Sequence, residues 1–316
     1  MRRFFLGVDG GQSSTTALIA NETGRILGRG RGGPCNHVRT PEGHEKFMSA
    51  VGGSLRDACL AAGLDDASVI FASACLGFSG GPEDKDPYSR ELIRSARYKI
   101  TNDAEIALSG ATAGQPGIIV IAGTGSIAYG RNARGDVARA GGWGYVFGDE
   151  GSAFDLVRQA LREVLRFEEG RGEPTILRAL LLEATGASDA NELLHLFYTS
   201  GYPRAKVASF ASLVTRAAEL GDRSAQDVLD HAAQQLASLA EAVYQRLFPS
   251  GDRIPVAYVG GVFESNRLLS AFKDRVRESI QCSAEPPRFS PAAGAVLDAL
   301  RLDGNASELS GVPGSE

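Results

Sequence analysis

Residues 4–19 read FFLGVDGGQSSTTALI, and this stretch decides the fold. An apolar run leads into Asp9, and two glycines and a cluster of hydroxyl side chains then precede a second apolar run. The pattern predicts a strand, a tight turn and a second strand. Gly10 and Gly11 leave room for a ligand beside the backbone, and the donors of Ser13 suit an oxyanion. Asp9 suits a hydrated Mg²⁺ ion. An ordinary hairpin with a Gly-Gly turn is the alternative.

A second stretch of the same design lies at residues 117–129, GIIVIAGTGSIAY. It again reads as a buried strand, a turn of glycines and a hydroxyl residue, and a second strand. Two such turns in one chain indicate an internal duplication, with two related half-domains facing each other across a nucleotide. This arrangement resembles the actin/Hsp70/hexokinase (ASKHA) superfamily of ATP-handling proteins. The resemblance implies an α/β protein with two actin-like (ribonuclease H-like) domains and an interdomain cleft.

The composition is that of an ordinary globular protein. The chain has 316 residues, enough for two domains with a core each, and 43% of them are hydrophobic. The net charge of -5 gives no basic footprint for nucleic acid. No apolar run is long enough to span a bilayer, and Asp9 interrupts the one that would read as a signal peptide. The cysteines lack CxxC spacing and read as reduced, mostly buried thiols of a cytoplasmic protein.

Two predicted strand ends between the glycine turns carry polar groups. Residues 69–76 (VIFASACL) predict a buried strand followed by a loop that contains Ser79, and residues 98–102 predict a short strand before a helix. Open α/β sheets bind ligands at such carboxyl ends. Asp103 is therefore a candidate to accept a proton from an attacking hydroxyl. The alternative is that Asp103 or Asn102 only caps the helix.

Residues 140–153 (AGGWGYVFGDEGSA) combine five glycines with the only tryptophan of the chain and an acidic pair. Asp149 and Glu150 suit the hydroxyls of a sugar, and Gly151-Ser152 opens a helix whose N-terminus favours anions. The alternatives are that Trp143 is a core aromatic residue and that the acidic pair merely starts the helix.

Most of the remaining chain is predicted to be helical. Apolar spacing predicts helices near 41–62, 88–97, 153–169, 174–184, 189–198, 203–219, 222–248 and 291–302. Residues 254–266 predict a strand, the double glycine Gly260-Gly261 and a helix start near Ser265, which suits the α-phosphate or adenosine of a nucleotide. We expect an N-terminal domain of residues 1–113 with the helix at 291–303, a C-terminal domain of residues 114–290 with a helical insertion, and a disordered tail at 304–316.

Seven segments occur in the order found in N-acetylglucosamine kinases of the BadF/BadG/BcrA/BcrD-type ATPase group: GVDGGQSSTTAL, PCNH, LGFSGG, TNDAE, IAGTGS, GGWGYVFGDEGSA and YVGGVFESN. The likeness runs to about residue 302. It implies a kinase that uses ATP and Mg²⁺ and moves the γ-phosphate of ATP to the 6-hydroxyl of N-acetylglucosamine. It also implies a homodimer.

The resemblance assigns roles to individual residues. Asp103 would be the catalytic base, and Asp9 would organise Mg²⁺ through water. The implied sugar contacts are Asn36, Ser79, Gly142, Trp143, Gly144 and Asp149. The implied nucleotide contacts are Gly10, Gly11, Gln12, Ser13, Gly123, Thr124, Gly125, Gly260, Gly261 and Ser265. The family commonly has Gly-Gly-Gly-Thr at the first turn, and Gln12-Ser13 replaces the second half of that motif while keeping a hydroxyl.

Other activities stay open at this point. Glucosamine is the close second substrate, because Glu83 and Asp84 follow the 78–81 loop and suit a free ammonium. An ATPase or a sugar sensor of the same fold, without kinase turnover, is a further alternative. Activators of 2-hydroxyacyl-CoA dehydratases carry cysteines for an iron–sulfur cluster, and ROK-type sugar kinases carry a zinc-binding cysteine cluster. The isolated cysteines of this chain argue against both.

Overall fold

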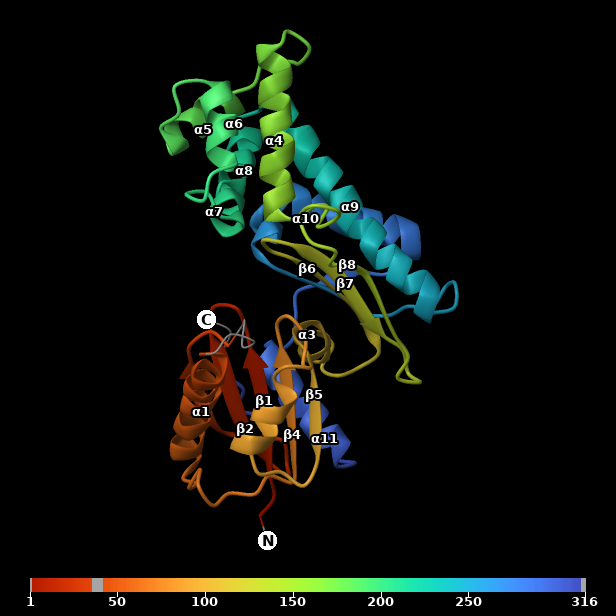
Figure 1. Ribbon diagram of the computed structural model, residues 1–316. Helices are drawn as coiled ribbons and strands as arrows, with labels where there is room; N and C mark the ends of the chain where they lie inside the picture. Colours follow the sequence, from red (N-terminus) through yellow and green to blue (C-terminus); the bar gives the residue numbers. More distant parts are fainter. Residues whose placement is uncertain (1, 36–41, 314–316) are drawn as a thin grey trace. The chain divides into compact units, whose positions relative to one another are not determined.

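The computed structural model describes residues 2–35 and 42–313 and divides into two compact units. Unit 1 consists of Met1–Pro116 and Pro287–Glu316, and unit 2 consists of Gly117–Pro286. Each unit holds one five-stranded sheet with helices packed on it (Figure 1). None of the helices in the described ranges is long and apolar enough to cross a membrane. The α/β class predicted from the sequence is confirmed.

The sheet of unit 1 has the strand order β3-β2-β1-β4-β5. Its strands are β1 (Phe4–Gly10), β2 (Thr15–Asn21), β3 (Ile26–Gly32), β4 (Ser73–Phe78) and β5 (Tyr98–Asn102). β2 lies antiparallel to β1 and β3, which confirms the first hairpin, whereas β1, β4 and β5 run parallel. The carboxyl ends of three parallel strands therefore meet at one edge of this sheet.

Helices cover both faces of this sheet. α1 (Gly43–Ala62) packs on β2 and β3, and α2 (Asp86–Leu92) packs on α1. α3 (Asp103–Ala111) and α11 (Pro291–Leu302) pack together and against β1 and β4. Successive residues of β1 point to opposite faces, so Leu6 and Val8 lie in the core beneath α1, while Phe5 lies in the core beneath α11.

The end of the chain differs from the expected disordered tail. Within residues 304–313, the side-chain amide of Asn305 donates to the Glu22 carbonyl at 2.7 Å, and Ser310 forms a β-bridge with Arg25. The polar composition of this segment favoured disorder. Main-chain groups and short polar side chains make its contacts at the β2–β3 turn, and Leu309 and Val312 pack against the core beneath α11. Isolated apolar residues and main-chain bonds of this kind leave no apolar periodicity in the sequence.

The sheet of unit 2 has the order β10-β9-β6-β7-β8. Its strands are β6 (Gly117–Ala122), β7 (Ser126–Arg131), β8 (Val137–Gly141), β9 (Val256–Val259) and β10 (Ala284–Glu285). The predicted second hairpin is confirmed, because β6 and β7 are antiparallel. β6 and β9 run parallel, as do β9 and β10. This is the strand pairing of unit 1 repeated in the same chain order, as expected for an internal duplication.

A helical segment is inserted in unit 2 between β8 and β9 (Figure 1). It contains α4 (Ala153–Glu168), α5 (Leu177–Thr185), α6 (Ala190–Phe197), α7 (Arg204–Ser209), α8 (Ala211–Glu219) and α9 (Arg223–Leu247). α9 packs on β6, β7 and β8, and its apolar stripe lies in the core as predicted. After β9 follow a 3-10 turn, η1 (Gly261–Glu264), and α10 (Asn266–Ile280), which packs on α9.

Candidate active site

The carboxyl edge of the unit 1 sheet gathers four predicted site residues. In the parallel register, Asp9 pairs with Gly77 and Gly10 with Phe78, while Phe78 pairs with Asn102. The residues that follow these positions, Ser79 and Asp103, therefore emerge beside Asp9. The Ser79 hydroxyl donates to Asp103 Oδ2 at 2.6 Å, so that Asp103 has a fixed orientation.

Asp103 is not the cap of α3. The side chain of Asn102 accepts the backbone N–H of Glu105 at 2.9 Å and caps this helix. The helix-capping role that the sequence left open therefore belongs to Asn102. The Asp103 carboxylate bonds to Ser79 instead. A carboxylate at the first turn of a helix, oriented by one hydroxyl, retains acceptor capacity for a proton.

Asp9 has the most perturbed carboxyl of this edge. Desolvation by the surrounding protein, and secondly the neighbouring charge of Asp103, raise its pKa from 3.8 to about 7. A cation beside the two carboxylates would relieve both effects. No group of three or more His, Cys, Asp or Glu residues capable of holding a metal lies within the described residues. Two neighbouring carboxylates are nevertheless a donor set that Mg²⁺ accepts, because this ion takes one or two carboxylates and completes its shell with water and phosphate oxygens.

The turn that follows Asp9 is closed by backbone bonds. The Gly11 N–H donates to the Ser14 carbonyl at 2.9 Å, and the Cys35 N–H donates to the Gly11 carbonyl at 3.3 Å. Gln12 and Ser13 are exposed at the tip of the turn. Their side chains are accessible to a ligand, as the phosphate-contact prediction requires. Asn36 lies outside the described residues.

In unit 2, the second glycine turn and the Gly260-Gly261 segment lie at one cavity of about 480 Å³. Because β6 and β9 are parallel neighbours, the segments that follow them emerge side by side. A Cβ on Gly260 would lie 2.2 Å from the Ala122 carbonyl oxygen, so this close approach requires glycine. Gly123, Thr124, Gly261 and Ser265 line the cavity, whereas Gly125 and Gly260 are not among its lining residues.

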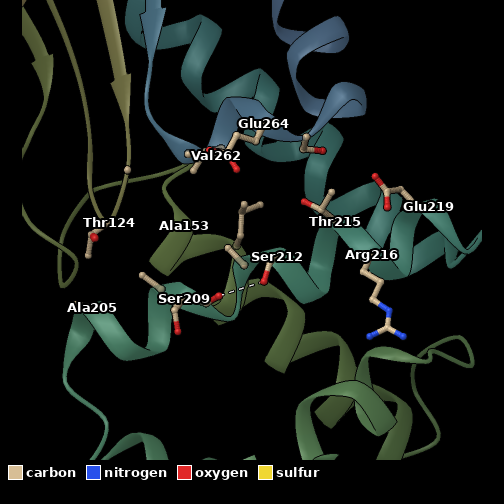
Figure 2. A pocket seen from close by; sticks show the side chains of 16 residues that line it. Thr124, Ala153, Ala205, Ser209, Ser212, Thr215, Arg216, Glu219, Val262 and Glu264 are labelled. Atoms are coloured by element: carbon tan, nitrogen blue, oxygen red, sulfur yellow. Dashed lines mark hydrogen bonds between the residues drawn. The ribbon is translucent and has the colours of Figure 1, made fainter. Parts of the chain in front are cut away.

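The opposite wall of this cavity comes from α7 and α8, which the sequence analysis did not assign to the site. Its residues are small or polar and recur at helical spacing: Ala205, Ala208, Ser209, Ala211, Ser212, Thr215, Arg216 and Glu219. Figure 2 shows Ser209 and Ser212 along this wall, with Thr124 and Glu264 on the other segments that line the cavity. The Ser265 hydroxyl is buried and has no hydrogen-bond partner among the described residues. An elongated cavity with glycine-rich backbone and scattered hydroxyls suits a phosphorylated nucleoside.

The glycine-rich loop after β8 divides into an exposed and a buried part. Trp143 is 67% exposed and has the Arg139 guanidinium 4.6 Å from its ring, which excludes the core-aromatic alternative. Asp149 is buried and accepts the Ser126 N–H at 3.3 Å. Its other oxygen, Oδ2, forms an ion pair with Arg204. The structure thus brings Asp149 next to the second glycine turn, while the side chain of Trp143 stands in solvent.

A model of the BadF/BadG/BcrA/BcrD ATPase family matches residues 6–299 of this chain. The chain belongs to this family. It is 34% identical over 283 residues to an N-acetylmuramic acid/N-acetylglucosamine kinase of Clostridium acetobutylicum, covering 86% of this chain and 89% of the relative. It is 31% identical over 322 residues to an N-acetyl-D-glucosamine kinase of Dictyostelium discoideum, covering 95% and 98%.

A solved structure supports the same assignment. A protein of Chromobacterium violaceum, described as a candidate N-acetylglucosamine kinase, superposes with a TM-score of 0.73 at 29% identity. The match covers 93% of this chain and 98% of that one. The predicted two-domain actin-like fold and the predicted family are therefore confirmed.

The sequence motifs did not indicate that Arg204 or the residues of α7 and α8 belong to the site of this BadF/BadG/BcrA/BcrD family member. The signal that could have revealed the wall is a helical stripe without large apolar side chains, in which alanine, hydroxyl and finally charged residues recur at three- and four-residue steps. Arg204 has no comparable signal, because it reaches its partners, Thr124 and Asp149, across the fold rather than along the chain.

Proposed function

We propose that this protein is an ATP-dependent kinase that transfers the γ-phosphate of ATP to the 6-hydroxyl of N-acetylglucosamine. The observation that carries the proposal is the cavity of unit 2, where two glycine segments far apart in the sequence line one space with the hydroxyls of α7 and α8. The names of the two relatives, both kinases of N-acetylglucosamine, support this sugar as the substrate.

In this reaction the nucleotide binds in the cavity of unit 2. The adenosine moiety lies against Ser209 and Ser212 of α7 and α8, and the phosphates extend toward Thr124. Backbone N–H groups of a glycine turn bind phosphate without a charged side chain, because several of them converge on one oxyanion. Gly10, Gly11, Gln12 and Ser13 of the first turn are proposed as further phosphate contacts.

Asp103 is the base that accepts the proton of the sugar 6-hydroxyl. As O6 of the sugar attacks the γ-phosphorus, the hydroxyl proton passes to the Asp103 carboxylate, the bond from the γ-phosphorus to the bridging oxygen breaks, and ADP leaves. Ser79 holds Oδ2 of Asp103 and leaves Oδ1 for the sugar. Mg²⁺, held in part by Asp9, would neutralise charge that develops on the phosphates. The sugar itself is proposed to contact Asn36, Ser79, Asp149 and the backbone around Trp143.

The deciding experiment is a steady-state assay of ADP release. N-acetylglucosamine, glucosamine, N-acetylmannosamine, N-acetylmuramate and glucose are compared by kcat/KM with ATP and Mg²⁺. N-acetylglucosamine should be the best of these substrates. Its 6-deoxy derivative should give no turnover and should act as a competitive inhibitor, since it keeps the other contacts but lacks the accepting oxygen.

Two outcomes would change the proposal. Glucosamine at a tenfold or greater advantage would replace the acetylated sugar with the free amine while leaving the kinase chemistry in place. ADP release that no sugar stimulates would refute the kinase and favour an ATPase or a sugar sensor of the same family.

A further inference from the structure

Arg204 links two parts of unit 2 that the proposed reaction uses for different substrates. It is the first residue of α7, and its Nη2 donates to the Thr124 carbonyl at 3.0 Å and also pairs with Asp149 Oδ2. Thr124 lies at the tip of the glycine turn that lines the nucleotide cavity. Asp149 is a proposed sugar contact. One nitrogen atom of Arg204 therefore bonds both the glycine turn at Thr124 and the carboxylate of Asp149.

The surroundings of this ion pair are shaped to hold it. A Cβ on Gly125 would lie 2.6 Å from Arg204 Nη2 and 2.9 Å from Asp149 Oδ2, so a side chain at this position would displace both partners. The Tyr145 ring lies under the guanidinium, with its centroid 5.4 Å away. Glycine at position 125 is therefore required by the ion pair as well as by any phosphate that approaches the turn.

The Asp149 carboxylate is held at both of its oxygens, on a backbone of uncommon conformation. Its φ of 59° lies in the left-handed region, which is uncommon for a non-glycine residue although aspartate tolerates it better than most. The Ser126 N–H bonds Oδ1 of this residue, and Arg204 pairs with Oδ2. An unpaired carboxylate here would also repel the phosphates of a nucleotide, and the Arg204 charge cancels that repulsion.

We propose that Arg204 is a positioning residue that fixes the glycine turn at Thr124 relative to the carboxylate of Asp149. Nucleotide binding at the turn and sugar binding at Asp149 then depend on one ion pair. This inference rests on the proposed kinase function. Arg204 acts through Thr124 and Asp149, and its Nε is buried without a hydrogen-bond partner among the described residues. The Nη2 contacts and the Tyr145 ring hold the guanidinium in place.

The test uses three variants of the full chain. Arg204→Gln removes the positive charge, and Arg204→Lys keeps the charge but loses the planar guanidinium. Gly125→Ala keeps every functional group but displaces the Arg204–Asp149 ion pair. The matched control is Arg178→Gln, which breaks the half-exposed Arg178–Glu168 pair in the same unit. ADP affinity is measured by calorimetry without sugar, and KM for N-acetylglucosamine and kcat are measured separately.

Arg204→Gln and Gly125→Ala should each weaken ADP binding about tenfold or more and raise the sugar KM by a similar factor, since each loses hydrogen bonds to a charged group. Arg204→Lys should fall between them and the wild type, and Arg178→Gln should leave both quantities unchanged. In a double-mutant cycle, Arg204→Gln combined with Asp149→Asn should raise the sugar KM no further than Asp149→Asn alone.

Other results would overturn the inference. Arg204 would be merely structural if its variants lowered the melting temperature but kept ADP affinity and the sugar KM. Additive effects of Arg204→Gln and Asp149→Asn would show that Arg204 does not act through Asp149. A wild-type protein with no sugar-stimulated turnover would refute the proposed function and the sugar half of this inference, whereas ADP binding would still decide whether Arg204 holds the turn.

Discussion

The raised pKa of Asp9 makes a prediction about stability that does not depend on any substrate. In the folded protein the pKa is about 7, against 3.8 for an ordinary aspartate. Between these values the folded protein binds a proton that the unfolded chain has released, so stability contributed by the neutral carboxyl is present at low pH and is lost as pH rises toward 7. About three pKa units correspond to roughly 4 kcal/mol of unfolding free energy.

Asp9→Asn removes this loss, because an amide stays neutral throughout. The variant and the wild type should unfold with nearly equal free energy near pH 4, and the variant should be the more stable by about 4 kcal/mol at pH 8.5. In a chain of this size the gain would raise the melting temperature by on the order of 10 °C. The assay is thermal unfolding followed by circular dichroism from pH 4 to 9, without nucleotide and with a chelator of divalent cations.

Two companion variants sharpen this measurement. Asp65→Asn is the matched control, because Asp65 is exposed and a hydrogen bond from Ser68 lowers its pKa, so its removal should give no gain at high pH. Asp103→Asn removes the second cause of the Asp9 shift and should reduce, but not abolish, the pH dependence. A stability difference between Asp9→Asn and the wild type that is the same at pH 5 and pH 8.5 would refute the assignment of a raised pKa to Asp9.

Three further predictions concern the proposed reaction. Asp103→Asn should lower kcat by about 10²–10⁴-fold with ADP affinity unchanged, and full turnover would remove Asp103 from the mechanism. Thr124→Val should weaken ATP binding or lower kcat while nucleotide-free sugar binding, followed by calorimetry, persists; unchanged kinetics would make this turn structural only. Ser212→Phe should fill the cavity and abolish ADP binding in the calorimeter. Its control is Ser238→Phe, an exposed serine whose hydroxyl also bonds a carbonyl three residues earlier; equal ADP affinity in both would place the nucleotide elsewhere.

Local signals were sufficient to predict most of the fold. Each hairpin combines apolar strands with a glycine turn, and the helix at 291–302 begins with a capping serine, Ser290, and Pro291 and was predicted with its observed bounds. The helix expected over 203–219 is interrupted at Phe210. This residue packs against Phe197 and Tyr202, and such tertiary packing leaves no trace in the spacing of apolar residues.

The candidate site was predictable where its residues follow strands. Asp9, Ser79 and Asp103 were found because parallel strands bring their carboxyl ends together whatever the loops between them contain. The α7–α8 wall and Arg204 belong to a helical insertion. Their partners depend on how α7 and α8 pack against α4 and on how α8 packs against α9. The local sequence carries no information about that packing.

The two units repeat one topology but differ in the charge at the carboxyl edge of their sheets. β1 ends in Asp9 and Gly10, whereas β6 ends in Ile121 and Ala122, so the first edge presents a carboxylate where the second presents apolar side chains. In unit 1, Asp9 lies close enough to Asp103 for the two charges to interact, which suits a proton acceptor and a cation. In unit 2, the carboxylate nearest the turn, Asp149, is neutralised by Arg204, and the turn offers N–H and hydroxyl donors. Phosphoryl transfer from ATP to a hydroxyl needs both kinds of surface, one that takes a proton and one that tolerates phosphate, and a duplicated fold can supply each from the same backbone.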